Sequence, residues 1–580
     1  MPLKKLSNAY THKSFVSLII VVVSAILFLP LIGSCDLFDW DEINFAECAR
    51  EMLMSDNYAE VQLYYQPFWE KPPIFIWMQA LSMKMFGVNE FAARFPNAIC
   101  GILTLLTLFR LGRSMHSPYF GIIWTLLYAA TLLPHFYFKS GIIDPWFNLF
   151  ILLAMLHLYR LTQADLVKQK YLQALLAALF TGTAVLTKGP AAVLIIGISM
   201  AAYLLRQKSL RSLFTPPFLL FYAAAIIFSG SWFLVEVLRG HQKIILDFIN
   251  YQIRLFKTGD AGHEGPFFYH VLVLLLGCFP ASVFFIKGLG KKYEGNDKAF
   301  RHLMLCVFWV VLILFSVVKT KIIHYSSLCY FPLTYVAAAE FMVRRHQAFH
   351  PLLKVLYWLL GILLSVAFVL VAFIDRLKNL PLVQRLIEDE DARNSLQADG
   401  QWIGYEWLIG FVFFMACLFL YKAYVAKNRG QLHQGLAALI VFNTLAISVI
   451  VPKIGIYTQQ AAIDFYREKA KEDCYLETHA FKSYAQLFYG DRQLRHFTCA
   501  DQKTYVLNQL DRMVGEGHSR SSSYSTAYTL WLENGITDKR TYIVVKTAKK
   551  DQITPKAHFN HLYDKNGYSF FVREVGSSVK

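Results

Sequence analysis

The sequence predicts a polytopic α-helical membrane protein with about 13 transmembrane helices and a small C-terminal α/β domain. Of its 580 residues, 56% are hydrophobic, and the mean hydropathy is +0.39, well above the range of soluble globular chains. Apolar stretches recur along most of the length, and many are long enough to cross a bilayer core of about 30 Å. After Pro452 the composition becomes that of a soluble domain.

About thirteen apolar stretches fit membrane-spanning helices. They cover residues 14–33, 95–111, 119–138, 142–159, 171–187, 190–205, 213–234, 267–286, 303–318, 325–343, 352–374, 403–424 and 432–452. The first stretch has an apolar core too long for a signal peptide and no small-residue cleavage site after it. We therefore expect it to remain as an anchor helix.

The positive charge of the chain indicates orientation in a membrane. The formal net charge is +17, and many lysines and arginines fall in short connections on alternate sides of the predicted spans. Such connections face the cytoplasm, as does the N-terminus. The external, periplasmic face then receives residues 34–94, 235–266, 375–402 and 453–580. We expect no nucleic acid partner, and the cytoplasmic connections hold no ATP-binding motif.

Two domains are expected. Residues 1–452 form the membrane domain, in which the periplasmic loop 34–94 carries surface helices such as Asp41–Met54. Residues 453–580 form a soluble periplasmic α/β domain, with strands at 474–479, 541–546 and 568–573, helices at 464–471 and 504–514, and a flexible loop at 519–526. Cys474 and Cys499 lie in this domain, and the sequence leaves open whether they form a disulfide.

Five polar constellations fall at the predicted external face, where carboxylates beside apolar spans cost free energy unless they are solvated, paired or bound to a ligand. They are Asp41-Glu42; Glu70-Lys71-Pro72-Pro73; Lys139 with Asp144; Lys188-Gly189-Pro190; and His263 with Lys319, Lys321, His324 and Tyr325. Lysines on the external side are disfavoured by topology alone and favour a phosphate ligand. Neighbouring carboxylates could act as a general base or as metal ligands, and Glu70 with His263 is a possible metal pair.

The order of these motifs resembles the bacterial branch of the protein O-mannosyltransferase superfamily, the branch that includes the lipid A aminoarabinose transferase. The motifs that carry the resemblance are Asp41-Glu42, Ala46-Glu47-x-Ala49-Arg50-Glu51-Met52, Glu70-Lys71-Pro72-Pro73, the intramembrane Asp144 and Leu186-Thr187-Lys188-Gly189-Pro190. The resemblance covers most of residues 10–345. It implies a GT-C fold, a periplasmic active site and an inverting glycosyl transfer from a polyprenyl-phosphate-linked sugar, without a nucleotide.

The resemblance also implies roles for individual residues. Asp41 matches the catalytic aspartate and Asp144 a second acid, with Glu42 beside the first. Lys71 and Tyr325 match residues at the donor phosphate, to which Lys321, Lys139 and Lys188 are candidate additions. Glu70 and His263 match positions that bind a divalent metal (Zn, Mg or Mn). Asn44 stands where the lipid A enzyme has an arginine, which removes a cation from the phosphate site.

Each residue also has a simpler interpretation. Asp41 can be a helix cap, Asp144 a partner of Lys139, Glu70–Lys71 an exposed ion pair, and Lys188-Gly189-Pro190 a structural turn. His324 is typical of an interfacial residue.

Three alternatives for function remain open from the sequence. The acceptor is lipid A, another glycolipid or an exported protein. A non-catalytic lipid carrier would keep the fold without needing Asp41. A transporter would place its charges near the bilayer midplane, whereas these polar residues gather at one face.

Overall fold

A computed structural model describes residues 2–257, 265–290, 298–342, 349–426, 428–492, 499–515, 520–556 and 558–575. The chain forms two compact units, each built from separate stretches of sequence. The membrane unit comprises Met1–Ile32, Arg94–Val369 and Leu408–Ile447, and the sheet unit comprises Gly33–Ala93, Leu370–Trp407 and Ser448–Lys580.

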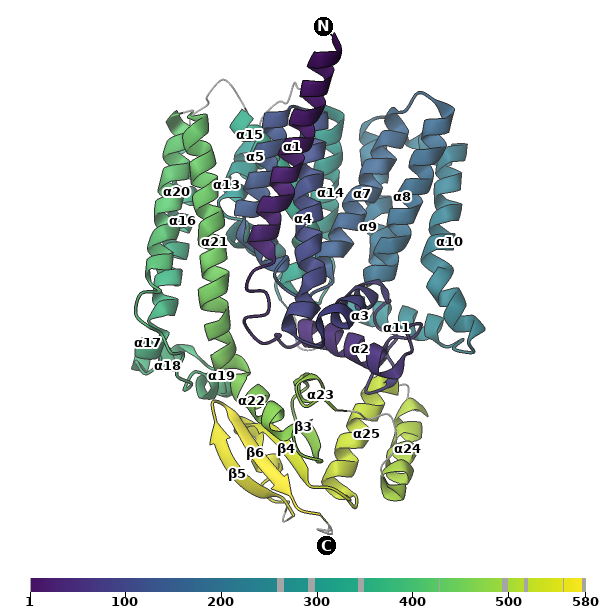
Figure 1. The fold of residues 1–580 in the computed structure, drawn as a ribbon, viewed down its shortest axis with the longest axis vertical. Coiled ribbons are helices and arrows are strands. Elements are labelled where there is room, and N and C mark those ends of the chain that lie inside the picture. The colour runs from purple at the N-terminus through teal and green to yellow at the C-terminus, as the bar shows by residue number, and fades with distance from the viewer. Residues whose placement is uncertain are drawn as a thin grey trace. The chain divides into compact units, whose positions relative to one another are not determined.

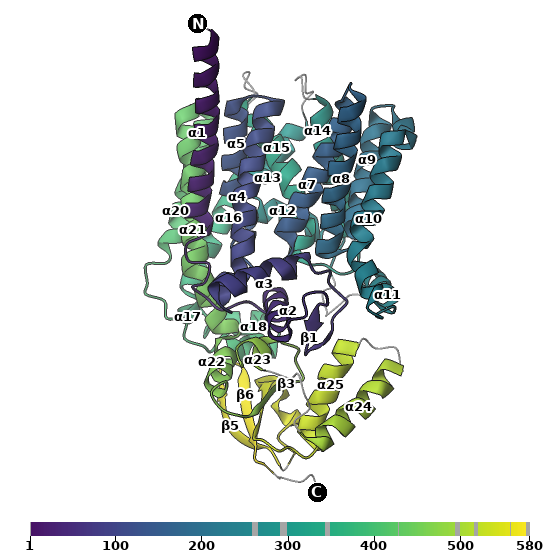
Figure 2. The ribbon, with the colours of Figure 1, turned by 45° about the vertical axis from the view of Figure 1, so that its right-hand side comes forward.

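The membrane unit is a bundle of apolar helices (Figures 1 and 2). Its helices are α1 (Pro2–Phe28), α4 (Glu90–Met115), α5 (Pro118–Ala130), α6 (Leu132–Tyr137), α7 (Asp144–Gln163), α8 (Val167–Lys188), α9 (Ala191–Arg206), η1 (Leu210–Phe214), α10 (Pro216–Leu238), α11 (Ile244–Lys257), α12 (Tyr269–Gly277), α13 (Ala281–Leu289), α14 (Lys298–Val317), η3 (Ile323–Cys329), α15 (Tyr330–Met342), α16 (Pro351–Ala372), α20 (Leu408–Ala426) and α21 (Arg429–Thr458). In the described part of the chain, seven helices are long and apolar enough to cross a membrane, or eight if α12 and α13 count as one span. The predicted class of polytopic helical membrane protein is confirmed.

Each predicted apolar stretch falls on a helix or on successive helices, but two stretches are broken. The stretch 119–138 divides into α5 and α6 at Thr131, whose backbone is extended. The stretch 267–286 divides at Pro280, where α12 and α13 meet at an angle of 114°. A proline has no N–H to donate and does not fit inside a helix without a kink or a break, so hydropathy alone joined segments that the backbone separates.

Close packing of α8 against α10 fixes the part of the bundle that carries the candidate site. A Cβ atom added to Gly182 of α8 would lie 2.4 Å from Cβ of Phe228 on α10, so only glycine allows this approach. α7 begins at Asp144 with Pro145 in its first turn, and α8 ends at Lys188 before Gly189, which has a φ of +107°. The start of α7 and the end of α8 lie together, because Lys188 forms an ion pair with Asp144.

The sheet unit combines three parts of the chain. The first part forms α2 (Asp41–Ser55), the short strands β1 (Gln62–Leu63) and β2 (Gln66–Pro67), and α3 (Ile74–Phe86). The second forms α17 (Ile374–Leu377), α18 (Pro381–Leu386) and α19 (Glu390–Ser395). The third forms α22 (Gln460–Lys469), β3 (Tyr475–His479), α23 (Ala485–Phe488), α24 (Ala500–Gly515), α25 (Arg520–Asn534), β4 (Thr541–Lys546), η4 (Thr547–Gln552), β5 (Asn560–Lys565) and β6 (Tyr568–Arg573).

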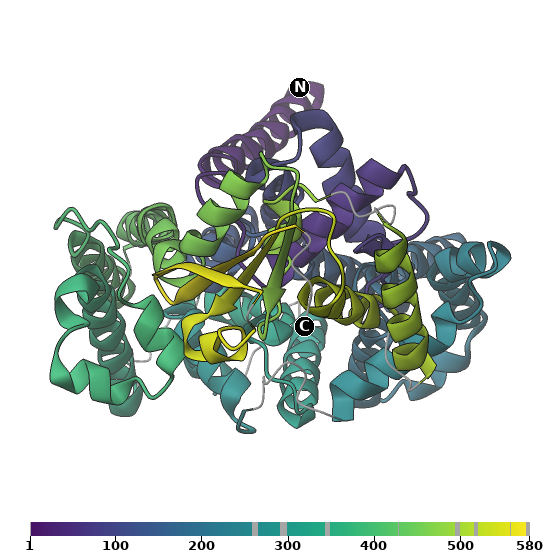
Figure 3. The same cartoon turned by 90° about the horizontal axis from the view of Figure 1, so that it is seen from below.

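Four of these strands form a mixed sheet in the order β3-β4-β6-β5 (Figure 3). β3 runs parallel to β4, and the other two pairs are antiparallel. One face receives Phe465 of α22, whose ring lies 4.5 Å from the ring of Phe570. The other face carries a buried cluster that includes Ile543 and Phe571. Both faces of the sheet are therefore covered.

The structure confirms the three predicted C-terminal strands and adds β5. The predicted flexible loop 519–526 is wrong where it is described, because residues from Arg520 onward belong to α25. The serine-rich sequence obscures the apolar pattern of this helix. Tyr528 and Trp531 are buried on one of its faces, and burial of those rings stabilises the helix. Cys474 and Cys499 are free thiols.

Candidate functional site

Asp144 and Lys188 form a buried ion pair in the membrane unit. The Lys188 Nζ lies 2.5 Å from Asp144 Oδ1, and the exposed fractions of the two side chains are 17% and 3%. The simpler sequence interpretation, in which Asp144 pairs with Lys139, does not hold. Lys188 is the more exposed partner and can reach a ligand, while the more deeply buried Asp144 carboxylate fixes the position of its ammonium group.

Aromatic rings enclose the Lys188 ammonium. Its Nζ lies 4.9 Å from the ring centroid of Tyr325 and 5.7 Å from that of Phe147. Two of the predicted site residues, Lys188 and Tyr325, are thus brought together by α8 and η3. Cation–π contacts of this kind hold a charged group in place where little water is available.

His324 also belongs to this site, in a position that the sequence does not predict. Its Nε2 lies 3.6 Å from Oδ2 of Asp144, although the sequence favoured an interfacial role for it. Its position directly before Tyr325 was the only available signal, because proximity to Asp144 depends on the packing of η3 against α7.

The other two candidate lysines of this unit bind backbone carbonyls. Lys321 Nζ donates hydrogen bonds to the carbonyls of Phe315, Ser316 and Val318 at 3.0, 2.7 and 2.6 Å. These carbonyls belong to the end of α14, so the ammonium satisfies acceptors that have no partner within a helix. Lys139 Nζ donates to the carbonyl of Pro30 at 3.1 Å.

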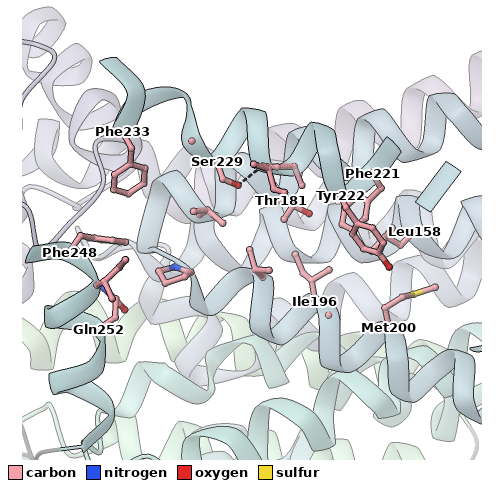
Figure 4. A pocket seen from close by; sticks show the side chains of 18 of the residues that line it. Leu158, Thr181, Ile196, Met200, Phe221, Tyr222, Ser229, Phe233, Phe248 and Gln252 are labelled. Atoms are coloured by element: carbon pink, nitrogen blue, oxygen red, sulfur yellow. Dashed lines mark hydrogen bonds between the residues drawn. The ribbon is translucent and has the colours of Figure 1, made fainter. Parts of the chain in front are cut away.

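A large apolar cavity opens beside the end of α8. Its volume is about 930 Å³, and α8, α9, α10 and α11 supply most of its lining. Figure 4 shows Phe233, Phe248 and Gln252 at one end of it and Tyr222 and Met200 at the other. Pro190, which also lines it, follows Lys188 by two residues. The cavity therefore reaches the turn that carries the candidate cation.

In the sheet unit, Asp41 and Glu42 begin α2. Asp41 is partly exposed, whereas Glu42 is buried and its Oε2 accepts a hydrogen bond from the backbone N–H of Phe38 at 2.9 Å. Glu42 thus holds the turn that precedes the helix. Carboxylates at a helix N-terminus are stabilised by the helix dipole, and the partly exposed Asp41 remains the one able to meet a substrate.

Glu70 and Lys71 lie against the same helix. The Lys71 Nζ is 5.8 Å from the ring centroid of Phe45, and both residues interact electrostatically with the buried thiol of Cys48. Phe45 and Cys48 follow Asp41 by four and seven residues, so all three share one face of α2. The predicted acid therefore lies on the face of α2 against which the predicted donor-phosphate lysine packs.

A buried ion pair ties α2 to the C-terminal part of the sheet unit. Arg50 is 1% exposed and makes two hydrogen bonds of 2.8 Å to the carboxylate of Glu47. It also donates to Asp491 at 3.1 Å and to the carbonyl of Arg492 at 2.7 Å. The motif Ala-Glu-x-Ala-Arg therefore anchors the helix.

The segment before α2 is also anchored. Burial raises the pKa of the Asp39 carboxyl to about 6, while a hydrogen bond from Ser483 acts in the opposite direction. The backbone N–H of Asp39 donates to the side chain of Gln459 at 3.1 Å. Both contacts fix the chain two residues before Asp41.

The candidate residues thus fall into two groups, one in each unit. Asp144, Lys188 and Tyr325 belong to the membrane unit, and Asp41 and Lys71 belong to the sheet unit. His263 lies outside the described residues. Glu70 belongs to no group of three or more metal-ligating side chains within the described ranges, so the residues that the structure places do not build a metal site around it.

Known proteins resemble both the sequence and the fold. Residues 70–232 match the dolichyl-phosphate-mannose-protein mannosyltransferase family. An undecaprenyl phosphate-alpha-4-amino-4-deoxy-L-arabinose arabinosyl transferase of Photorhabdus laumondii is 29% identical over 314 residues, which are 53% of this chain and 56% of that protein. The corresponding transferase of Pectobacterium carotovorum is 28% identical over 327 residues, 56% of this chain and 58% of that protein. The matches therefore span a little over half of each relative.

The crystal structure of ArnT from Cupriavidus metallidurans bound to undecaprenyl phosphate superposes with a TM-score of 0.71. The superposition covers 97% of this chain and 98% of that one at 16% identity, and the apo form of the same protein gives the same score. The chain has the ArnT fold. The resemblance to the mannosyltransferase superfamily and its aminoarabinose transferase, predicted from the motifs, is confirmed.

Proposed function

We propose that this protein is a glycosyltransferase that moves 4-amino-4-deoxy-L-arabinose, or a similar sugar, from undecaprenyl phosphate to lipid A. The observation that carries the proposal is the Lys188–Asp144 pair, in which Lys188 lies two residues before Pro190, a residue that lines an apolar cavity of about 930 Å³. A cation beside an apolar cavity is complementary to a lipid phosphate, with the charged head at Lys188 and the prenyl chain among apolar side chains. The names of the relatives support the sugar and the carrier lipid.

The reaction needs positive charge at the phosphate and a base for the acceptor. The bond between the anomeric carbon and the phosphate oxygen breaks, and its electron pair stays on the phosphate, where a lysine ammonium such as that of Lys188 stabilises the new charge. The acceptor oxygen forms the new bond to the anomeric carbon. An acceptor hydroxyl gives its proton to Asp41, whereas a phosphate oxygen needs no base.

Lys321 and Lys139 contribute less to this reaction than the sequence predicts. Both ammonium groups already donate hydrogen bonds to backbone carbonyls, and breaking these bonds would cost the energy of burying unpaired polar groups. We therefore propose that both lysines stabilise the backbone around the site through these hydrogen bonds.

The finer topology is part of the proposal. About thirteen spans follow from the apolar stretches, and a cytoplasmic N-terminus and a periplasmic sheet unit follow from the positive-inside rule. The undecaprenyl-phosphate relatives support a bacterial inner membrane, because that carrier lipid is in the names of the transferases.

A divalent metal on Glu70 and His263 remains a separate proposal, through which no step above is routed. Metal analysis of the purified protein tests it directly. We expect about one equivalent of Zn, Mn or Mg in wild type and its loss in Glu70→Gln. Equal metal content in both proteins would reject this ligand set.

The proposed function is tested by sugar transfer in proteoliposomes. Wild type would receive undecaprenyl phosphate-linked aminoarabinose with lipid A, and product would be identified by mass. We expect transfer in wild type and a loss of about 10²–10⁴-fold in Asp41→Asn, the range for removal of a general base. Lys71→Ala should also reduce transfer, because it removes a cation proposed to bind the donor phosphate. Asp165→Asn, at an exposed position, serves as the control.

The outcomes separate the alternatives. Full activity in correctly inserted Asp41→Asn would show that the base assignment is wrong. Product on exported protein but not on lipid A would show that the acceptor is a protein. Binding of undecaprenyl phosphate without any transfer would favour a lipid carrier.

A further inference from the structure

The two oxygens of the Asp144 carboxylate have different surroundings. Oδ1 accepts the 2.5 Å hydrogen bond from Lys188. Oδ2 is buried and accepts no hydrogen bond from the described residues, yet His324 Nε2 lies 3.6 Å from it. That distance is too long for a hydrogen bond but short enough for an ion pair. A small movement of the imidazole would satisfy the orphaned oxygen.

The backbone of His324 is held in a fixed relation to Asp144. The hydroxyl of Ser327 donates to the His324 carbonyl at 2.5 Å, and Asn148 donates to that hydroxyl at 2.8 Å. Asn148 lies one turn after Asp144 on α7. The same helix that carries the carboxylate therefore positions the histidine, and the approach of the two side chains does not depend on a loop.

The charge of the site depends on His324. Asp144 and Lys188 together are neutral, so a net positive charge at this point requires a protonated imidazole. Around it lie the phenols of Tyr137 and Tyr325, with ring centroids at 6.4 and 5.5 Å from that of His324. His270 of α12 interacts electrostatically with both His324 and Lys321. The Asp144 carboxylate is an acidic partner of His324, with its Oδ2 at 3.6 Å from Nε2.

Transfer changes the charge that this site must hold. The sugar-linked donor is a phosphodiester with one negative charge, and the polyprenyl phosphate that remains carries between one and two near neutral pH. The neutral Asp144–Lys188 pair holds the Lys188 ammonium by a short charge-assisted bond. A second cation on the carboxylate would weaken that bond and release the ammonium toward the phosphate.

We propose that His324, in its protonated form, is a positioning residue that pairs with Asp144 and frees Lys188 for the leaving phosphate. This proposal rests on the proposed function, because it explains how the site compensates the charge that the phosphate gains in that reaction. His324 acts through Asp144 and needs no contact with the substrate. Its protonation makes the site cationic when the phosphate gains charge, and its loss of the proton returns Lys188 to the carboxylate.

The test compares a neutral and a permanently charged replacement. Wild-type turnover should fall as pH rises through the range in which histidine loses its proton. His324→Gln should lose about tenfold or more in turnover at pH near 6, and its pH profile should become flatter. His324→Lys should restore turnover and keep it at higher pH. His561→Gln, on β5 of the sheet unit, is the matched control, and size-exclusion chromatography with thermal unfolding checks each fold.

Binding of undecaprenyl phosphate, measured in detergent without any sugar donor, gives a second readout. We expect the affinity of wild type to exceed that of His324→Gln at pH near 6 and to approach it at high pH. This difference would appear even if wild type transferred no sugar, so failure of the proposed function and failure of this proposal are distinguishable. Wild-type turnover, pH profile and lipid affinity in folded His324→Gln would overturn the proposal. So would a folded His324→Lys that behaves like the glutamine variant.

Discussion

Burial strengthens the coupling between single charged residues in this protein. Asp144 is 3% exposed and Lys188 17% exposed, so water screens their attraction less than it would at a surface. Buried pairs of this kind are costly to break, because removal of one partner leaves the other charge buried without compensation.

Lys188→Ala tests this coupling. We expect a loss of transfer of about 10²-fold or more together with a loss of stability of about 3 kcal/mol, because Asp144 would keep its charge without a partner. The double variant Asp144→Asn/Lys188→Met removes both charges and should regain stability while staying inactive. Thermal unfolding and the transfer assay measure the two effects separately. A double variant no more stable than Lys188→Ala would show that the pair is not the source of the loss.

Glu477 provides a prediction on pH. Burial raises the pKa of its carboxyl from 4.5 to about 7, although Tyr64, Gln486 and the backbone of Thr478 hydrogen-bond it. The folded state then keeps the proton that the unfolded state releases. Stability is therefore highest below pH 4.5 for this group and falls by about 3 kcal/mol as pH rises to 7. Denaturant unfolding between these pH values should show a weaker fall in Glu477→Gln, and an unchanged slope would reject the assignment.

At the scale of elements, α2 is held by contacts far apart in sequence. Arg50 reaches Asp491 and the carbonyl of Arg492, and Glu51 accepts the backbone N–H groups of Tyr64 and Tyr65 at 2.8 and 2.7 Å. Of these contacts, only the one to Asp491 involves an exposed side chain. These contacts join α2 to both the N-terminal and the C-terminal parts of the sheet unit, and the position of Asp41 depends on both.

Arg50→Lys tests the anchoring of α2. Lysine keeps the charge but cannot reproduce the forked geometry of the guanidinium toward Glu47. We expect a loss of about 2 kcal/mol or more in thermal or denaturant unfolding, with reduced transfer because Asp41 is less well held. Arg110→Lys, on the exposed side of α4, is the control. Unchanged stability in Arg50→Lys would mean that the bidentate contact contributes little.

At the scale of the molecule, the basic connections and the polar units predict a single orientation. A phosphatase fused after residue 575 should be active in the periplasm, and a green fluorescent protein at the same point should stay dark. Fusions in the connection between α7 and α8, which Arg160 and Lys168 flank, should give the reverse pattern. Phosphatase activity at both points would contradict the proposed topology.

The sequence predicts much of the helical layout and only part of the site. Apolar stretches reveal helices because membrane-like burial needs about 20 apolar residues wherever the helix is placed. The sequence singles out Asp144 and Lys188 for their chemistry and leaves Lys139 as one possible partner of Asp144, whereas the structure pairs Asp144 with Lys188. The approach of His324 to Asp144 and the anchoring role of Arg50 are not predicted, because each depends on a partner that only packing brings near.

Local sequence by itself determined the class of this protein: a helical membrane chain with carboxylates and lysines in a transferase-like order. The tertiary structure alone decided which charges meet. Lys188 rather than Lys139 holds Asp144, Lys321 holds a helix end, and the serine-rich segment from Arg520 becomes a helix. The physical reason is that hydropathy and backbone preference act within a few neighbouring residues, whereas ion pairs and buried rings depend on contacts between distant segments.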